Sequence, residues 1–211
     1  MTSTPPRKPD PSKSPAVMRF VDSTRLSLDQ VRDGDGYDLS ALHGLPNPEA
    51  AFILDFLNQR LESFGANWRD VDAMAALEIP PARMAIKRLA AHPSSEVRLR
   101  AARHLSERGD ESAAETAIVR LLRDADTDIG ADALMTMAQD HPTMAVRQVL
   151  LECALDGAGH LRVHAAALAL FLAGGAKESF DWSYRPLFLE FGESERDTRV
   201  AAMEKLEKLM G

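Results

Sequence analysis

One cysteine and six histidines are among the residues of this chain that could hold a metal ion or act as nucleophile and base. A single cysteine can form no internal disulfide, and no pair of histidines has the spacing to cysteines that a zinc site needs. His92 and His141 each precede a proline at the end of an expected helix. Cys153 stands where a leucine-type residue is expected, which predicts a small buried group in a reducing compartment. The sequence predicts no catalytic residue, no metal site and no cofactor.

The acidic turn from Asp33 to Gly36 alternates acid and glycine, as a calcium loop does. An EF-hand loop requires glycine at its sixth position and an acidic residue at its twelfth. Counted from Asp33, those positions hold Asp38 and Gly44. The cluster therefore predicts a turn and no calcium site.

The segments that carry these residues repeat at an offset of 32 residues, in two interleaved apolar series. One series contains Ile86, Ile118 and Leu150 together with Leu89, Leu121 and Cys153, and the other contains Val97, Ile129 and Leu161 together with Ala101, Ala133 and Ala165. Two series with one period predict a repeated helix pair, and a pair this short must stack on its copies to bury its apolar stripe. The predicted fold class is all-α, an α-solenoid of about four to five stacked antiparallel helix pairs.

Capping and breaking residues give the expected helix boundaries. Asn47 begins the first helix and Gly65 ends it, and Asn67 caps a second helix that ends before Pro80. Further helices are expected over 81–91, 94–108, 111–123, 128–139, 143–155, 160–173, 181–191 and 194–210.

Composition predicts three parts of the chain. Residues 1–16 are rich in proline, serine and lysine without the apolar stretch of a signal peptide, and predict a disordered tail. Residues 17–46 predict an irregular, weakly structured segment compatible with one or two short strands. Residues 47–211 form the expected repeat domain. No apolar stretch has the roughly 20 residues that span a bilayer, so we expect a cytoplasmic protein with no membrane partner.

Residues 96–105 (EVRLRAARHL) and 160–169 (HLRVHAAALA) resemble the first helix of a HEAT repeat, and residues 197–206 (DTRVAAMEKL) resemble a later copy. The shared pattern is an acid-rich turn, a β-branched or apolar residue, an arginine and then paired alanines. The copy at 128–138 departs, because Gly130 stands in the arginine position. The step from Arg162 to Arg199 is 37 residues, so we expect a loop insertion at 176–180. The chain is thus similar to HEAT-repeat proteins of the armadillo-type and PBS-lyase HEAT-like group.

This resemblance implies a protein that binds another protein and has no enzyme activity. In HEAT-like stacks the second helix of each pair lines the concave side. The residues that we expect to contact a partner there are Arg83, Lys87, Arg88, Glu115, Arg120, Arg123, Arg147, Glu152, Tyr184 and Arg185. Arginine and tyrosine on rigid helices are typical interface anchors.

Two other groups have a structural and a functional interpretation. Arg98, Arg162 and Arg199 recur at one repeat position and predict ion pairs to acidic turn residues, with ligand contact as the alternative. The aromatic group at 180–191 predicts a core that caps the last repeats, with a recognition pocket as the alternative. It consists of Phe180, Trp182, Tyr184, Phe188 and Phe191.

The distribution of charge along the chain indicates which class of partner it suits. The net charge of −7 is uneven, with a basic excess over 80–125 between acidic segments. This pattern argues against nucleic acid as the partner and suits a protein with basic or mixed charge.

A general scaffold or adaptor is the first hypothesis for the function. The second is an immunity protein, similar to an antitoxin, that neutralises a basic toxin in a bacterium. A HEAT-like DNA-binding protein or alkylpurine DNA glycosylase is the third. HEAT-type metal hydroxylases are excluded because no histidine here precedes a glutamate, and no residue marks a bilin lyase site.

Overall fold

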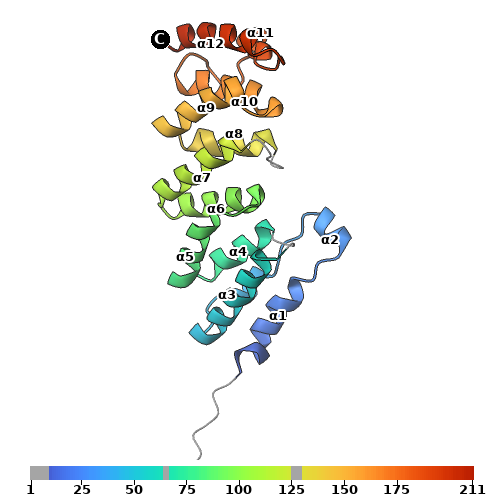
Figure 1. The fold of residues 1–211 in the computed structure, drawn as a ribbon. Helices are drawn as coiled ribbons and strands as arrows, with labels where there is room; N and C mark the ends of the chain where they lie inside the picture. The colour runs from blue at the N-terminus through green and yellow to red at the C-terminus, as the bar shows by residue number, and fades with distance from the viewer. Residues whose placement is uncertain (1–9, 64–66, 125–129) are drawn as a thin grey trace, which may run out of the picture. The chain divides into compact units, whose positions relative to one another are not determined.

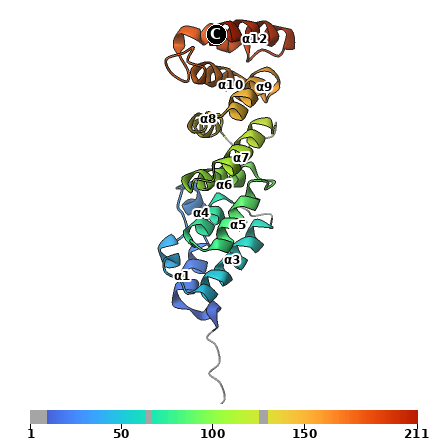
Figure 2. The same ribbon diagram turned by 90° about the vertical axis from the view of Figure 1, so that its left-hand side faces the viewer.

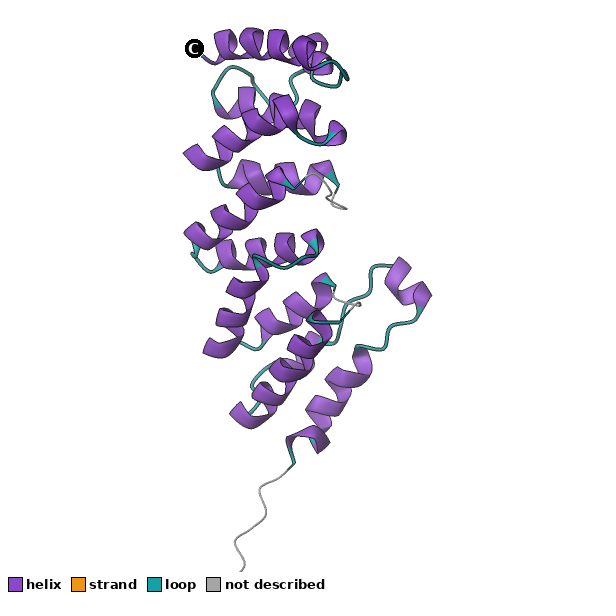
Figure 3. Cartoon of the chain, in the orientation of Figure 1, coloured by secondary structure: helices purple, strands orange, loops and turns teal. Residues whose placement is uncertain are grey.

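A computed structural model describes residues 10–63, 67–124 and 130–211 of the chain. In these residues the protein consists of helices, turns and loops and has no strand (Figure 3). The chain forms two compact units, Met1–Leu89 and Ala90–Gly211. The sequence placed the start of the helical domain at residue 47, whereas the break between the units lies between Leu89 and Ala90.

The first unit is built around three consecutive helices (Figure 1). Its elements are η1 (Pro11–Lys13), α1 (Pro15–Ser23), α2 (Leu28–Arg32), η2 (Leu39–Leu42), α3 (Asn47–Leu61), α4 (Trp68–Ala76) and α5 (Pro80–Leu89). α4 packs against both α3 and α5, while α1 packs against η2. The largest fully buried side chains of this unit are Phe20, Leu42, Ile53, Leu57, Met74 and Ile86.

The expectation of short strands within 17–46 is wrong. Val17 and Phe20 are three residues apart and are both buried, which is the spacing of one helix face. Met18, which lies between them in the chain, is 53% exposed. Pro15 supplies the first turn of α1, and the Ser27–Gln30 capping box starts α2. Local start signals and one buried face therefore make this segment helical.

The predicted disordered tail, residues 1–16, lies in part outside the described residues. Those that are described, 10–16, form η1 and the beginning of α1. Asp10 accepts a hydrogen bond from the Ser12 amide at 3.1 Å, and Ser14 donates to Glu49 of α3 at 3.0 Å. The Ser14–Glu49 hydrogen bond and the packing of η1 against α3 tie residues 10–16 to the first unit.

The second unit holds α6 (Ser95–Glu107), α7 (Glu111–Arg123), α8 (Ala131–Asp140), α9 (Met144–Asp156), α10 (Gly159–Leu172), η3 (Trp182–Tyr184), α11 (Arg185–Glu190) and α12 (Arg196–Met210). α6 packs along α7, and α9 along α10. Helices two apart in the chain also pack together, namely α7 with α9 and α8 with α10. In Figure 2, α7 and α9 lie to one side of α8.

The burial of residues on α5, α7 and α9 confirms one of the two apolar series. Ile118, Leu150, Leu121 and Cys153 are all buried in the second unit, and Ile86 and Leu89 are buried in the first. The series of the first helices fails at α8, where Ala133 is exposed and its neighbour Leu134 is fully buried. Burying leucine removes more apolar surface from water than burying alanine. Ile129 lies outside the described residues.

The helix expected over 181–191 is shorter than predicted. Asp181 caps the 3₁₀ turn η3 through the Ser183 amide at 2.9 Å, and α11 begins only at Arg185. Pro186 falls in the first turn of α11, where its missing amide hydrogen is tolerated. Tyr184 and Arg185 therefore lie at the start of this helix.

Candidate functional site

The α5 part of the predicted concave face is exposed as expected. Arg83, Lys87 and Arg88 are all exposed, while Ala85 and Ile86 on the opposite side of the helix are buried. α5 belongs to the first unit and the other predicted contact residues belong to the second. The predicted face is therefore divided between the two units.

The α7 and α9 parts are brought together within the second unit. Arg123 of α7 donates from Nε and Nη2 to one carboxylate oxygen of Glu152 on α9, at 3.2 and 3.1 Å. Both side chains remain about half exposed, at 57% and 45%. Arg120 and Arg147 are exposed on the same two helices, and Glu115 is half-buried. Arg147 also donates to the Pro142 carbonyl at 3.1 Å, which fixes its Nε at the start of α9.

The aromatic group at 180–191 is divided between core and surface. Phe188 and Phe191 are completely buried, and Phe180 and Tyr184 are half-buried with their rings 5.5 and 6.2 Å from that of Phe188. Trp182 is 67% exposed, and the Arg185 guanidinium lies 5.1 Å from its ring centroid. The two predicted site residues, Tyr184 and Arg185, thus lie against Phe188 and Trp182.

Two of the recurring arginines, Arg98 and Arg199, have structural partners among the described residues. Arg98 donates from Nη1 to the His92 and Pro93 carbonyls at 2.7 and 2.9 Å, and its Nη2 forms an ion pair with Asp124 at the end of α7.

Arg199 repeats this geometry, donating from Nη1 to the Glu193 and Ser194 carbonyls, both at 2.7 Å. In each case the acceptors lie six and five residues before the arginine, so the side chain clamps the turn that precedes its own helix. The ion pair expected for this position is present for Arg98, and carbonyl oxygens are the acceptors for Arg199.

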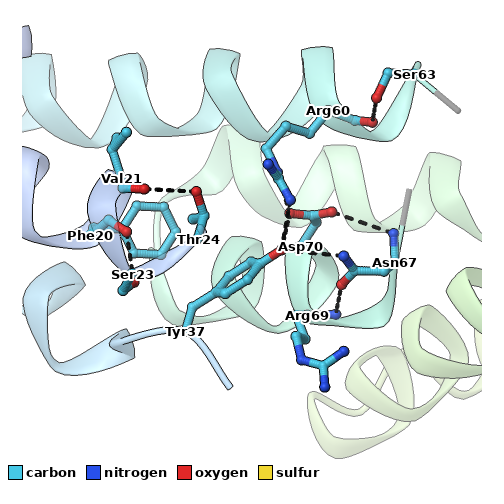
Figure 4. Close-up of polar contacts among 10 residues, drawn as sticks. All are labelled: Phe20, Val21, Ser23, Thr24, Tyr37, Arg60, Ser63, Asn67, Arg69 and Asp70. Atoms are coloured by element: carbon cyan, nitrogen blue, oxygen red, sulfur yellow. Dashed lines mark hydrogen bonds and ion pairs between the residues drawn. The ribbon is translucent and has the colours of Figure 1, made fainter. Parts of the chain in front are cut away.

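A buried polar network in the first unit was not anticipated from the sequence (Figure 4). Asp70 of α4 is completely buried and accepts from Arg60 Nε of α3 at 2.8 Å and from the Tyr37 hydroxyl at 3.1 Å. Arg60 Nη2 and Asn67 Nδ2 donate to the same hydroxyl at 2.8 and 3.3 Å. Burial raises the pKa of Tyr37 above its usual value. We interpret this network as structural, because its carboxylate has no access to solvent.

One serine–histidine contact has the form of a nucleophile and its base. His141 is buried, with Nε2 2.7 Å from the Ser106 hydroxyl and Nδ1 3.0 Å from the Met137 carbonyl. The Glu111 carboxylate lies 3.3 Å from the same Nε2. Both ring nitrogens of His141 are thus engaged by contacts within the second unit. The contact instead links α6, α7 and the end of α8.

Cys153 is the small buried group that the sequence predicts. Burial raises the pKa of its thiol to about 11, against a smaller lowering effect of Arg162. A Cβ atom at Gly157 would lie 2.7 Å from the sulfur and 2.5 Å from the Cys153 carbonyl oxygen, so glycine is needed beside it. A thiol held protonated in this way is a poor nucleophile.

Within 10–63, 67–124 and 130–211, no three histidine, cysteine, aspartate or glutamate side chains gather as they would around a metal ion. In those ranges no helix has the length and apolar character to cross a bilayer. The Asp33 to Gly36 segment forms the predicted turn after α2, with Gly34 at a φ of +83°.

The second unit has a cavity of about 380 Å³ between α8, α10 and the loop that precedes η3. We call it the α8–α10 cavity, and it is lined by Asp132, Met135, Thr136, Gln139, His164, Leu168, Ser179 and Phe180. Of these residues only Phe180 was named in the sequence analysis, as part of the aromatic group whose alternative interpretation is a recognition pocket. The signal that could have found the cavity is the insertion at 176–180, which contributes Ser179 and Phe180 to its wall.

Comparisons of this chain with protein-family models, with curated proteins and with solved structures found no match.

Proposed function

We propose that this chain is a non-catalytic helical-repeat module, similar to HEAT-repeat proteins, that binds another protein through the exposed face of α7 and α9. The observation that carries the proposal is the direct packing of α7 against α9. Arg120 and Arg123 are exposed on α7, and Arg147 and Glu152 are exposed on α9. Ile118, Leu121 and Leu150 are buried behind this face and hold the two helices in place.

The repeat interpretation rests on contacts two helices apart. In a stack of helix pairs, the second helices of consecutive pairs adjoin each other, and so do the first helices. α7 and α9 adjoin as second helices, and α8 and α10 adjoin as first helices. The offset of 32 residues between buried anchors agrees with one such step.

A partner of mixed charge suits this face. Arg120, Arg123 and Arg147 supply directional donors, and Glu152 supplies an acceptor beside Arg123. Arginine and carboxylate pairs on rigid helices give orientation and specificity to an interface. We expect no strong salt-dependent binding to duplex DNA, because the whole chain has a net charge of −7.

The experiment begins with capture of the partner from the native host and its identification by mass spectrometry. Binding of the purified partner is then measured by calorimetry for the wild type and for Arg120→Glu. We expect at least a tenfold loss of affinity, since rigid interfacial charges of the wrong sign repel. Arg103→Glu on α6 is the matched control, because it makes the same charge change on an exposed arginine. Equal affinity for wild type and Arg120→Glu would rule out the α7–α9 face.

An immunity role is the second candidate, supported by the net charge of −7, which favours a basic partner. Co-expression distinguishes it from a scaffold. An immunity protein restores growth to cells that produce its partner, whereas a scaffold has no such effect.

A further inference from the structure

The α8–α10 cavity combines an apolar floor with a polar rim. Met135 and Leu168 are 8% and 1% exposed and form the floor. Asp132, Thr136, Gln139 and Ser179 are exposed around the opening. A volume of about 380 Å³ falls in the usual range of ligand sites, roughly 300–1,000 Å³. The space therefore accepts a group with an apolar stem and a polar end.

The ring of Phe180 forms one wall of the cavity and packs against two other rings. The Phe180 ring centroid lies 5.5 Å from that of buried Phe188 and 5.9 Å from the His164 ring. These contacts fix the ring at the edge of the cavity. A cation within about 6 Å of such a ring is attracted to its face.

The loop that carries this ring is internally organised. Asp181 accepts hydrogen bonds from the amides of Lys177 and Ser183 at 3.3 and 2.9 Å. Gly174 has a φ of +84°, and a Cβ on Gly175 would lie 2.4 Å from Leu170 Cδ1 and 2.8 Å from the Leu209 carbonyl oxygen. Gly175, just before the insertion, is thus packed closely against α10 and α12, and the hydrogen bonds of Asp181 organise the inserted residues that follow.

The charge around the cavity is negative. Asp132 is the sole aspartate, glutamate, lysine or arginine among the lining residues, and α8 carries two aspartates and no basic residue. Arg162 is the arginine of α10. Its charge lowers the pKa of the Cys153 thiol on α9, and its Nε is buried. Lys177 and Glu178, just before Ser179, have opposite charges. The charged group at the rim therefore favours a cation.

We propose that the α8–α10 cavity receives an arginine side chain from a partner protein. The aliphatic stem lies along Met135 and Leu168, and the guanidinium faces the Phe180 ring and the Asp132 carboxylate. Gln139, Thr136 and Ser179 offer oxygen acceptors for the remaining N–H groups of the guanidinium. A planar guanidinium uses a ring and several acceptors together, whereas a lysine ammonium is a point charge with fewer donors.

The first experiment locates the binding site with blocked arginine (N-acetyl-arginine amide). The full chain is labelled with ¹³C at the methionine methyl groups, and the Met135 resonance is assigned with Met135→Leu. Titration should shift the Met135 signal saturably and leave Met144, 84% exposed on α9, in place. Blocked citrulline has nearly the same shape as blocked arginine but no charge. Its affinity, measured from the Met135 signal, should be at least tenfold lower.

The second experiment tests the carboxylate. Asp132→Asn should weaken binding of blocked arginine at least tenfold, while Asp140→Asn on the same helix should change it less than twofold. Asp132 also lies in the first turn of α8, where a carboxylate favours the helix, so the helical content of both variants is compared by circular dichroism. Gln139→Lys places a positive charge at the rim without altering that turn and should also abolish binding.

The outcomes separate this proposal from that of the α7–α9 face. The arginine titration requires no identified partner, and Arg120→Glu should leave it unchanged. Absence of a Met135 shift, an equal shift with citrulline, or equal effects of Asp132→Asn and Asp140→Asn would each overturn the cavity proposal, whatever the result for the α7–α9 face.

Discussion

Replacing Asp70 by asparagine should destabilise the first unit by about 3 kcal/mol. Its carboxylate is completely buried and accepts from Arg60 Nε at 2.8 Å and from the Tyr37 hydroxyl at 3.1 Å. Asparagine keeps the size but removes the charge that Arg60 faces. Removing one partner of a buried ion pair costs about 3–5 kcal/mol. The Arg60 side chain is 30% exposed and regains part of its hydration, so we take the lower end of that range.

The two tryptophans of the chain allow this effect to be measured in the intact protein, because one lies in each unit. Trp68 is the first residue of α4, two positions before Asp70. In a Trp182→Phe background, the fluorescence of Trp68 reports unfolding of the first unit in urea. For a urea slope near 1–2 kcal/mol per molar, a loss of about 3 kcal/mol lowers the midpoint by roughly 2 M.

Asp55→Asn is the matched control, since Asp55 is an exposed carboxylate in α3 and its replacement should stay within about 0.5 kcal/mol. Tyr37→Phe should fall between the two, because it removes the shared hydroxyl and leaves the Arg60–Asp70 ion pair. If Asp70→Asn moved the Trp68 transition no further than Asp55→Asn, the network would not be what joins α3 to α4.

Three further predictions concern the second unit, with Trp182 as the reporter in a Trp68→Phe background. Burial raises the pKa of Cys153 to about 11 from 9.0, so the folded state keeps a proton that the unfolded chain loses. The corresponding stability is complete below about pH 9 and should fall by about 3 kcal/mol as the pH rises to 11, and Cys153→Ala should remove this decline in urea titrations across that range. Arg98→Ala should cost about 3 kcal/mol through loss of its carbonyl bonds and its ion pair, whereas Arg103→Ala at an exposed position should cost less than about 0.5 kcal/mol. Gly175→Ala should cost about 1–3 kcal/mol because its Cβ meets a backbone oxygen, and a thermal midpoint equal to that of wild type would contradict the packing of the loop.

The helices of the second unit could be predicted well because the signals that define them are local. Thr143 and Ser94 accept from the amides three residues ahead, as residues that start helices do. The anchors Ile118, Leu121 and Leu150 are buried as their spacing predicts. A repeated apolar stripe indicates both a helix and the side of it that packs, so type and burial could be predicted together.

The register of α8 could not be predicted from the offset alone. Arg98 and Arg199 bond the turns before α6 and α12, and the corresponding residue before α8 is Gly130, which has no side chain to do so. With no such clamp, the burial of Leu134 in place of Ala133 decides the helix face. The burial pattern expected for α8 was taken from the neighbouring segments. It was wrong because α8 lacks the arginine that bonds the preceding turn in α6 and α12.

The first unit shows a second reason for failure. Tyr37 meets Asp70, 33 residues away, and Arg69 Nε donates to the Asp35 carbonyl at 2.6 Å across a similar separation. These are single long-range contacts without a period, and no local propensity encodes them. The capping box of Ser27 and Gln30 starts α2 through local contacts, whereas the burial of α1 depends on partners that only the folded chain brings near.

The irregular places in the proposed repeat are also the places where a specific site can form. In a regular stack, each anchor position is constrained by the neighbouring helix pair, so its side chain is committed to packing. The insertion at 176–180 adds residues that have no equivalent in the adjacent pair. Phe180 folds back on Phe188 and, with Ser179, faces α8, the helix whose start departs most from the repeat. The α8–α10 cavity lies where these two departures meet, so the break in period marks the place where we propose a binding site.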